Sequence, residues 1–481
     1  MSKKTYNVDL CIIGAGAGGL SIASGAAQLG RSVVLYEAEA MGGDCLNYGC
    51  VPSKALIAAG KHAHAFSTGE PFGVAIAEPT IDFAAVKSHV KGVIETIAPV
   101  DSQERFEGLG CTVIRELASF KDANIVQSAS TITRAKRIVI ATGSRASAPP
   151  IPGLKKTPFT TNEEIFSIEK LPKHLLIIGS GPIGLELGQT FNRLGSKVEI
   201  IDIAHPLDRS EPEHAKVLIE ALKEEGVIFH APVNTKLVRT TRAKPSSRKS
   251  GVAIDLEDGT TITGSHLLVA AGRRPVIENL NLEAAGVTTG RGGIVTDKYL
   301  RTSNKRVYAI GDVSGRGGLT HIAGHHASVI IKNFYFVPFF KASAEINNMP
   351  AAVYTQPELA SIGLTEKSAR GKYSDIKVVH FDFEENDRAI AERSTKGAVK
   401  IIARSNGRIV GASIVGESAG DLIHIISLAM ANKMKIVHLT KMISPYPTRS
   451  EAVKRAASSW YTESIFSPKT RKLAALMARF H

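Results

Sequence analysis

Short apolar runs, each followed by a glycine-rich turn, dominate the pattern of hydrophobic and polar positions along this chain. Residues 8–13 predict a buried parallel strand, residues 20–29 a helix of small side chains, and residues 32–36 a second strand. The same order returns later, where strands over 174–179 and 197–201 flank a helix that opens at Gly184. Alternation of strand and helix predicts an α/β fold with two Rossmann-like units.

The first glycine-rich turn carries Gly14, Gly16 and Gly19. Gly14 permits the tight turn, Gly16 lets a pyrophosphate approach the backbone, and Gly19 lets the helix pack against the sheet. The start of the helix favours the negative charge of the pyrophosphate. Glu37 ends the next strand and is placed to accept hydrogen bonds from ribose hydroxyls. We assign FAD to this dinucleotide site.

The second turn repeats the fingerprint with Gly179, Gly181 and Gly184, and the strand after its helix ends at Asp202. A carboxylate at this point accepts a hydrogen bond from a ribose 2′-hydroxyl and repels a 2′-phosphate. The sequence therefore favours NAD over NADP at the second site. NADPH stays an alternative, because Arg209, in the loop that follows, could still reach its 2′-phosphate.

Two of the four cysteines, Cys45 and Cys50, lie close together and just after the first fingerprint. So few cysteines favour a reducing, cytoplasmic compartment, where a single pair is usually catalytic. Pro52 and Lys54 follow Cys50 at a predicted helix start, where the helix dipole and the lysine stabilise a thiolate. The alternatives are a structural disulfide or a pair of metal ligands. Because zinc in proteins is usually coordinated by four ligands, we predict no metal site.

Four further segments, residues 138–143, 268–275, 307–312 and 354–360, complete a pattern that covers nearly the whole chain. In this order, and together with the two fingerprints and the cysteine pair, they resemble the pyridine nucleotide–disulfide oxidoreductases. This is the family of dihydrolipoamide dehydrogenase, glutathione reductase and mercuric reductase. The resemblance implies a homodimer in which electrons pass between the nicotinamide, the flavin, the Cys45–Cys50 disulfide and the substrate.

The resemblance also implies a domain order. We expect an FAD-binding domain over 1–150 and 273–345, and an NAD(P)-binding domain over 151–272. A C-terminal α+β dimerisation domain follows over 346–466, and a basic amphipathic tail over 467–481.

Residue roles follow from the same resemblance. Cys50 is expected to be the sulfur next to the flavin, and Cys45 the thiol that attacks substrate. Lys54 and Glu186 are expected to pair beside the flavin N5, and Asp312 to bind the ribityl chain. The cofactor-binding residues implied in addition to the two fingerprints and their carboxylates are Gly43, Thr142, Gly143, Gly272, Arg274 and Gly311.

One segment departs from the family pattern. Dihydrolipoamide dehydrogenase and glutathione reductase serve the attacking thiol with a His-Pro-x-x-x-Glu dyad from the other subunit. Here Tyr446 replaces the histidine, although Pro447 and Glu451 are kept. A general base works best with a pKa near the operating pH, which histidine (about 6.5) meets and tyrosine (about 10) does not.

A tyrosine at this position resembles mercuric reductase, but that enzyme also uses a C-terminal cysteine pair, and this sequence has no cysteine after Cys111. Three hypotheses therefore stay open. The chain is a dihydrolipoamide dehydrogenase-like enzyme for a disulfide or dithiol, a mercuric reductase-like reductase of metal ions, quinones or other oxidants, or a non-catalytic flavin redox sensor.

Positive charge is concentrated in two places, although the formal net charge of the whole chain is +14. Residues 236–249 form one basic cluster, but no stacking aromatics accompany it, so we predict no nucleic-acid partner. In the tail, Leu473, Leu476, Met477 and Phe480 recur at helical spacing among basic residues. Such a helix could lie on an anionic membrane surface or pack on the dimer. No run is long enough to span a membrane.

Overall fold

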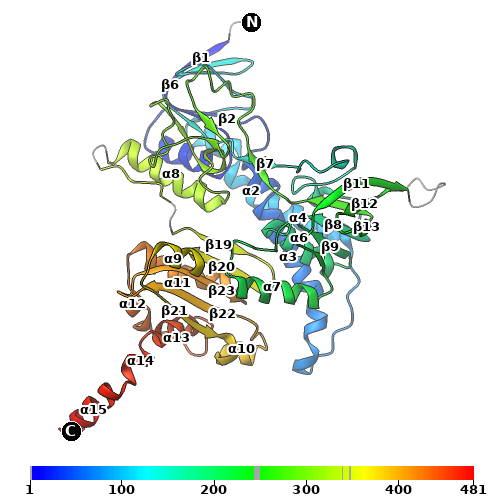
Figure 1. Ribbon diagram of the computed structural model, residues 1–481. Helices are drawn as coiled ribbons and strands as arrows, with labels where there is room; N and C mark the ends of the chain where they lie inside the picture. Colours follow the sequence, from blue (N-terminus) through cyan, green and yellow to red (C-terminus); the bar gives the residue numbers. More distant parts are fainter. Residues whose placement is uncertain (1–2, 243–249, 338–339, 346–347, 481) are drawn as a thin grey trace. The chain divides into compact units, whose positions relative to one another are not determined.

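The computed structural model describes residues 3–242, 250–337, 340–345 and 348–480 (Figure 1). Residues 243–249, the second half of the predicted basic cluster, lie outside the described residues. The chain forms two compact units. The first unit holds residues 1–179, 190–201 and 233–346, and the second unit holds residues 180–189, 202–232 and 347–481. Helices and strands occur in both units, so the predicted α/β class is confirmed.

A seven-stranded sheet forms the centre of the first unit, in the order β3-β2-β1-β6-β5-β4 with β18 paired to β6. The strands β3, β2, β1, β6 and β18 pair in parallel. Apolar side chains of β1, β2 and β6 are fully buried, among them Leu10, Leu35 and Ile138. The bounds are β1 Lys4–Ile13, β2 Val33–Tyr36, β3 Cys111–Ile114, β4 Ser119–Asp122, β5 Ile125–Gln127, β6 Thr131–Ile140 and β18 Val307–Ala309.

The predicted first strand is too short, because β1 begins at Lys4 rather than at residue 8. Lys4 is exposed, and its place in the strand is set by pairing with Thr131 of β6 rather than by burial. An apolar pattern does not detect such a ladder.

Helices pack around this sheet. Helix α1, Ala17–Gln28, follows β1 and packs beside α8, Thr320–Tyr335. Helix α1 begins three residues before the predicted start at residue 20 and ends one residue before the predicted end at residue 29, since helix ends depend on capping groups that periodicity does not show. The other helices of this part are α2 Gly43–Asn47, α3 Cys50–His64, α4 Phe83–Ile97 and α5 Gln103–Gly108, and the short 3₁₀ turn Ala98–Asp101 joins α4 to α5.

A second, smaller parallel sheet in the first unit contains β9, β8 and β14, and an antiparallel sheet contains β11, β12 and β13. The two sheets share one apolar core, which includes Leu176, Ile178, Ile254 and Leu267. The bounds are β8 His174–Ile178, β9 Lys197–Ile201, β11 Thr235–Arg242, β12 Ser250–Leu256, β13 Thr261–Gly264 and β14 His266–Val269. Two small ladders pair β7 Ser144–Ala146 with β15 Arg273–Pro275, and β16 Thr289–Gly290 with β17 Gly293–Ile294.

The second unit is built on a five-stranded antiparallel sheet in the order β19-β20-β23-β22-β21. Helices α11, Ala419–Ala431, and α13, Glu451–Ser459, pack on it, and Ile401, Ile414 and Ile426 lie in the shared core. The strands are β19 Pro350–Val353, β20 Glu358–Gly363, β21 Ile376–Asp382, β22 Ala398–Arg404 and β23 Ile409–Gly416. The remaining elements are β10 Ile228–His230, α7 Pro212–Glu224, α9 Glu366–Lys372, α10 Asp387–Ala391, α12 Ile436–Thr440, α14 Thr462–Ile465 and α15 Pro468–Met477.

Helix α6, Pro182–Arg193, carries the chain from one unit to the other. The structure confirms the predicted helix in the tail, because α15 begins at Pro468 behind an N-cap at Ser467. Among the described residues, we find no helix with the length and apolar character needed to cross a bilayer. The predicted boundaries of the four domains stay a prediction.

Candidate active site

The first phosphate loop has the geometry that the fingerprint predicts. Gly14 has φ of +107°, and a Cβ there would lie 2.5 Å from the Ala141 carbonyl oxygen. A Cβ on Gly19 would lie 1.9 Å from the Gly14 oxygen, so neither position accepts a side chain. Helix α1 has Gly16 as its N-cap, and its first turn has no acidic residue and no side-chain cap. The first-turn N–H groups of α1 are thus left for an anionic ligand.

Glu37 holds this loop directly. Its Oε2 accepts a hydrogen bond from the Ala15 N–H (2.7 Å), and its Oε1 accepts one from the Glu39 N–H (2.7 Å). Burial raises the pKa of the Glu37 carboxyl, while the hydrogen bond from the Ala15 N–H and the charge of Arg115 act in the opposite direction. The carboxylate therefore positions the phosphate loop, and its contact with a ribose stays a prediction.

A polar network joins three segments of the first unit around Asp312. The Ser144 hydroxyl donates to Asp312 Oδ2 (2.5 Å) and accepts from Arg273 Nε (2.8 Å). Arg273 also forms an ion pair (3.2 Å) with Asp44 of α2, in the cysteine segment, residues 43–50, that carries Cys45 and Cys50. Burial raises the pKa of Asp312, against the effect of the Ser144 hydrogen bond. The network fixes the position of the Asp312 carboxylate beside the cysteine segment.

Sequence reasoning missed Arg273 and Ser144. It selected Arg274, whose guanidinium pairs instead with the exposed Glu278. Because successive side chains of a strand point to opposite faces, only one arginine of the doublet in β15 can join the network. The two remaining predicted residues of this region are Thr142, whose hydroxyl donates to the Val276 oxygen (2.6 Å), and Gly143, with φ of +69° and open space at its Cβ position.

Two further predicted glycines lie close by. Gly311 has φ of +65°, and its N–H donates to Nδ1 of the fully buried His326 (3.1 Å). Gly43 has φ of +60°, and a Cβ there would lie 2.7 Å from the Gly16 Cα. The cysteine segment thus approaches the first phosphate loop so closely at residue 43 that only glycine fits there.

The second phosphate loop is built in the same way. Gly179 has φ of +115°, and a Cβ there would lie 2.6 Å from the Ala270 oxygen. Asp202 Oδ2 accepts from the Ser180 N–H (2.6 Å) and from the Ser180 hydroxyl (2.7 Å). Open space lies at the Cβ positions of Gly181 and Gly272, and Gly184 is buried within α6.

Cys45 and Cys50 are brought together at the junction of α2 and α3, as free thiols joined by a hydrogen bond. That bond from Cys45, the Thr320 hydroxyl and the charge of Lys54 lower the pKa of Cys50 to about 6, although burial opposes them. The Thr320 hydroxyl lies 3.3 Å from the Cys50 sulfur. The pKa of Cys45 is raised, first by its bond to Cys50 and then by burial. One sulfur is therefore a thiolate at neutral pH and the other a thiol.

Thr320 is the third residue that sequence reasoning missed. Its position as the first residue of α8, shortly after Gly317 and Gly318, was the available signal. It lies far from the cysteines in sequence, so only the fold brings its hydroxyl to their sulfurs.

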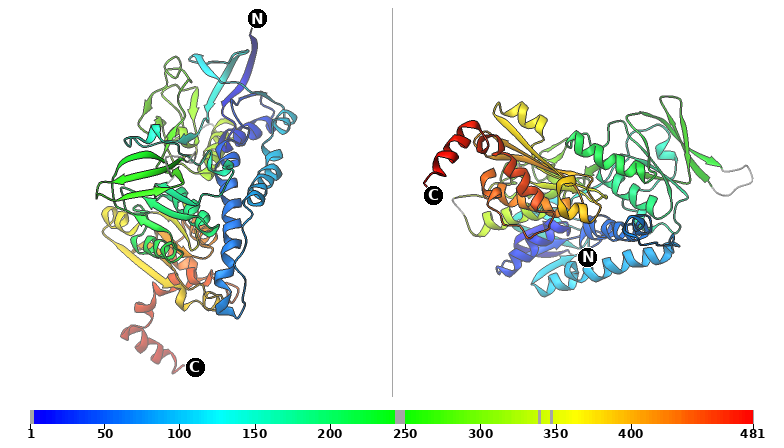
Figure 2. Two further views of the ribbon diagram at one scale, coloured as in Figure 1. Left: turned by 90° about the vertical axis from the view of Figure 1, so that its right-hand side faces the viewer. Right: turned by 90° about the horizontal axis from the view of Figure 1, so that it is seen from below.

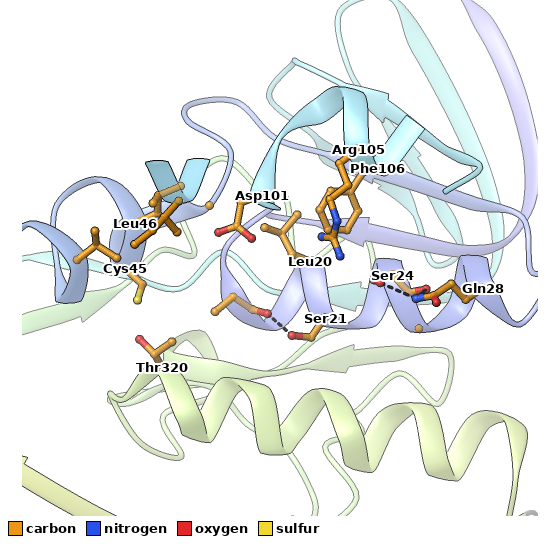
Figure 3. A pocket seen from close by; sticks show the side chains of 15 residues that line it. Leu20, Ser21, Ser24, Gln28, Cys45, Leu46, Asp101, Arg105, Phe106 and Thr320 are labelled. Atoms are coloured by element: carbon orange, nitrogen blue, oxygen red, sulfur yellow. Dashed lines mark hydrogen bonds between the residues drawn. The ribbon is translucent and has the colours of Figure 1, made fainter. Parts of the chain in front are cut away.

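A pocket of about 600 Å³ opens beside Cys45 (Figure 3). Helix α1 forms its floor, with the Cys45 sulfur and Thr320 at one end and Gln28 at the other. Asp101 and Arg105 come from the turn and helix above it, and burial raises the pKa of Asp101. The apolar part of the lining contains Leu20, Leu46, Val51, Ile97 and Phe106, and the polar part on α1 contains Ser21, Ser24 and Gln28.

Tyr446 lies in the second unit, with 70% of its surface exposed. Its hydroxyl donates a hydrogen bond to Asp387 Oδ2 (2.8 Å), and this bond and the carboxylate charge raise the pKa of Tyr446. Glu451 begins α13, five residues along the chain in the segment that sequence analysis singled out. The phenol is held as a hydrogen-bond donor, so even less of the proton-accepting phenolate is present at neutral pH than in free tyrosine.

Glu186, on α6, is buried, and its Oε1 accepts from the Tyr354 N–H (3.0 Å) within the second unit. Lys54 belongs to the first unit, on α3. The predicted ion pair between them stays a prediction.

One group of acidic side chains in the described part of the chain is close enough to hold a metal ion: Glu211, Glu213 and Glu366. The ammonium group of the buried Lys400 occupies it, at 2.7, 2.5 and 2.7 Å from the three carboxylates. These contacts make the group an ion-pair network of the second unit.

Comparison with known proteins agrees with this geometry. Residues 8–327 match the family model "Pyridine nucleotide-disulphide oxidoreductase", and residues 349–457 match the dimerisation domain of the same family. The match to the dimerisation domain supports a homodimer. FAD and NAD(P)H are the cofactors of this family, and the two phosphate loops described above fit two such dinucleotides.

Three relatives illustrate the range of the family. A mercuric reductase of Streptomyces lividans is 34% identical, over 95% of this chain and 96% of its own length. Dihydrolipoyl dehydrogenase 3 of Haloarcula marismortui is 32% identical, over 96% of this chain and 98% of its own. The HOCl-induced flavoprotein disulfide reductase RclA from Escherichia coli, also solved as a Cu(II) complex, has a TM-score of 0.83 at 27% identity, over 94% and 99%. The chain belongs to the pyridine nucleotide–disulphide oxidoreductases, which confirms the resemblance that its motifs predict.

Proposed function

We propose that this enzyme transfers two electrons between NADH and an organic disulfide or dithiol, in the manner of dihydrolipoamide dehydrogenase. One observation carries the proposal. Two hydrogen-bonded thiols, Cys45 in α2 and Cys50 at the start of α3, have pKa values shifted in opposite directions, and Cys45 lines a pocket large enough for an organic molecule. Bound FAD supplies the two-electron chemistry that connects this pair with the nicotinamide nucleotide.

The two cysteines have different tasks in this proposal. Cys45, as a thiolate, attacks one sulfur of the substrate disulfide, and the other substrate sulfur leaves and takes up a proton. The Cys50 thiolate then attacks the Cys45 sulfur, so that the Cys45–Cys50 disulfide forms and the second substrate sulfur leaves as a thiolate, which takes up a proton from water. The pair loses two electrons and the substrate gains them. Since the pKa of Cys45 is raised, its proton must first be removed by another group.

The pocket gives the class of acceptor. Its lining combines the apolar side chains of Leu20, Leu46 and Phe106 with polar groups of α1 and the charged side chains of Asp101 and Arg105. Such a lining binds an apolar body with a polar end rather than a bare ion. A lipoyl group or a quinone has this character.

Asp202 supports NADH as the preferred nucleotide. Its carboxylate is fixed against the second phosphate loop by Ser180, where it can accept from a ribose 2′-hydroxyl. The second site would discriminate against NADPH through charge repulsion. Dithiol chemistry requires a reducing compartment, and we place the enzyme in the cytoplasm, with its last helix adding a peripheral position at the inner face of a membrane.

Tyr446 favours a second candidate function, the reduction of metal ions or quinones. Reduction of these acceptors involves no dihydrolipoyl thiol, so no general base is needed to deprotonate it. The Tyr446 phenol cannot serve as such a base, because it donates its proton to a hydrogen bond with Asp387. The relatives named mercuric reductase and the Cu(II) complex of RclA lend support to this class of acceptor. The two cysteines beyond the pair, Cys11 and Cys111, are both buried, so they cannot deliver mercury to it.

One panel tests these proposals: NADH and NADPH against lipoamide, glutathione disulfide, a quinone, Hg(II), Cu(II) and oxygen. We expect NADH-dependent turnover with lipoamide. Turnover with the quinone or with metal ions but not with lipoamide would overturn the first proposal in favour of the second. No turnover with any acceptor, together with normal reduction of bound FAD by NADH, would favour a redox sensor.

A further inference from the structure

The last helix of the described chain leaves its apolar side uncovered. Leu473 is 58% exposed, Leu476 51%, Met477 54% and Phe480 76%. Figures 1 and 2 show α15 running away from the sheet of the second unit, joined to it through α14. Ile465 and Phe466, just before α15, are exposed as well. No described residue of the second unit buries this apolar stripe.

The charges of this segment indicate what covers the stripe. From Pro468 to Phe480 the chain has four basic residues and no acidic one: Lys469, Arg471, Lys472 and Arg479. Lys472 precedes Leu476 by one helical turn and Arg479 follows it, so both lie along the edge of the stripe. A basic edge beside an apolar stripe is the arrangement of helices that lie in the interface of an anionic bilayer.

A second copy of this chain is the less suitable occupant. Each copy has a net charge of +14, so the basic helix would approach a surface of the same overall sign. An anionic phospholipid surface attracts the basic residues and accepts the apolar side chains. We propose that α15 lies on the surface of an anionic phospholipid membrane and anchors the enzyme there. The inference does not depend on which acceptor the enzyme uses.

Co-sedimentation of the full-length, FAD-loaded protein with vesicles tests this inference. We expect binding to vesicles of phosphatidylcholine with 30% phosphatidylglycerol. Binding to vesicles of phosphatidylcholine alone should be weaker by at least about tenfold. Reversal of Lys472 and Arg479 to glutamate should weaken binding to the anionic vesicles by at least about tenfold. Replacement of Leu473, Leu476 and Phe480 by serine should weaken it by roughly a hundredfold.

The matched control places three serines on the other side of the helix, at Ala474, Ala475 and Ala478, which are also exposed. This variant should bind like the wild type. NADH-dependent turnover in solution and FAD content should be the same for all variants, which shows that they fold. The inference fails if the wild-type protein does not bind anionic vesicles, or if both serine variants bind equally. It also fails if only the stripe variant dissociates the dimer in light scattering, since a second copy would then cover the stripe.

Discussion

We propose that the cysteine segment of the first unit and the Tyr446 segment of the second unit serve the same chemistry, yet their surroundings differ. Cys50 is held by a thiol, a hydroxyl and a lysine, and all three stabilise its thiolate. Tyr446 is exposed, and its hydrogen bond to Asp387 stabilises its protonated form. The first segment is thus prepared to give up a proton and the second to keep one.

This difference separates two requirements of disulfide exchange. The storage of two electrons in a sulfur pair needs only the surroundings of Cys45 and Cys50, which the first unit supplies complete. The removal of a proton from Cys45 or from a dithiol substrate needs a base, and Tyr446 does not supply it. Electron storage and proton transfer can therefore be changed independently in this chain.

The largest expected effect comes from the sulfur pair. Cys45→Ser should lower turnover with lipoamide by at least about 10³-fold, because the attacking sulfur is lost. The Cys50 thiolate should remain in this variant. The long-wavelength absorbance that the thiolate gives beside bound FAD should therefore remain as well. Steady-state rates and absorbance spectra of the variant check this.

Cys50→Ser is the matched control for that experiment. It should lose both the turnover and the long-wavelength absorbance, while FAD content stays the same. If Cys45→Ser retains lipoamide turnover within about tenfold of the wild type, or if it also loses the absorbance, the assignment of the two sulfurs is wrong.

The second effect concerns the base. Tyr446→His should raise the rate of dihydrolipoamide oxidation by about 10²-fold, because imidazole titrates near neutral pH. Tyr446→Phe removes the phenol without adding a base and should bring no such gain. Stopped-flow rates for both variants, compared over pH 6 to 9, measure the effect. An equal rate in all three proteins would show that this segment does not serve the thiols.

The two segments also differ in how far sequence reasoning could predict them. The phosphate loops, both carboxylates that follow them and the cysteine pair could be predicted because each is local in sequence and has a fixed spacing. The replacement of histidine by tyrosine at position 446 was also visible. Its hydrogen bond with Asp387 was not, because the two residues are brought together only by the fold.

The same limit explains the residues that were missed. Thr320 reaches Cys50 from a helix that begins far along the chain. Arg273 was passed over for Arg274 because the choice depends on which face of β15 is turned to Asp44 and Ser144. In each case the fold class was predictable, but contacts between distant segments were not.

A smaller effect is expected at the second phosphate loop. Asp202→Asn keeps an oxygen that can accept from Ser180 but removes the charge that repels a 2′-phosphate. The ratio of kcat/KM for NADH over NADPH should fall by about tenfold, and Asp202→Glu, which keeps the charge, should largely preserve it. An unchanged ratio in Asp202→Asn would assign the choice of nucleotide to another group, such as Arg209.

The smallest effect is a change in a pH midpoint, and it tests the surroundings of Cys50 directly. The pKa of Cys50 is lowered to about 6, so its thiolate is present above that pH and is lost as the pH falls through it. The long-wavelength absorbance of the two-electron-reduced enzyme should therefore decline with a midpoint near 6. Thr320→Val removes one hydrogen bond to the sulfur and should move the midpoint up by about one pH unit.

Thr320→Ser keeps the hydroxyl and should leave the midpoint where it is in the wild type. Since Lys54 and the Cys45 thiol remain in both variants, a difference between valine and serine isolates the hydroxyl. A midpoint that is the same in all three proteins would show that the hydroxyl does not stabilise the thiolate. The contrast with Tyr446 would then rest on the Cys45 thiol and Lys54 alone.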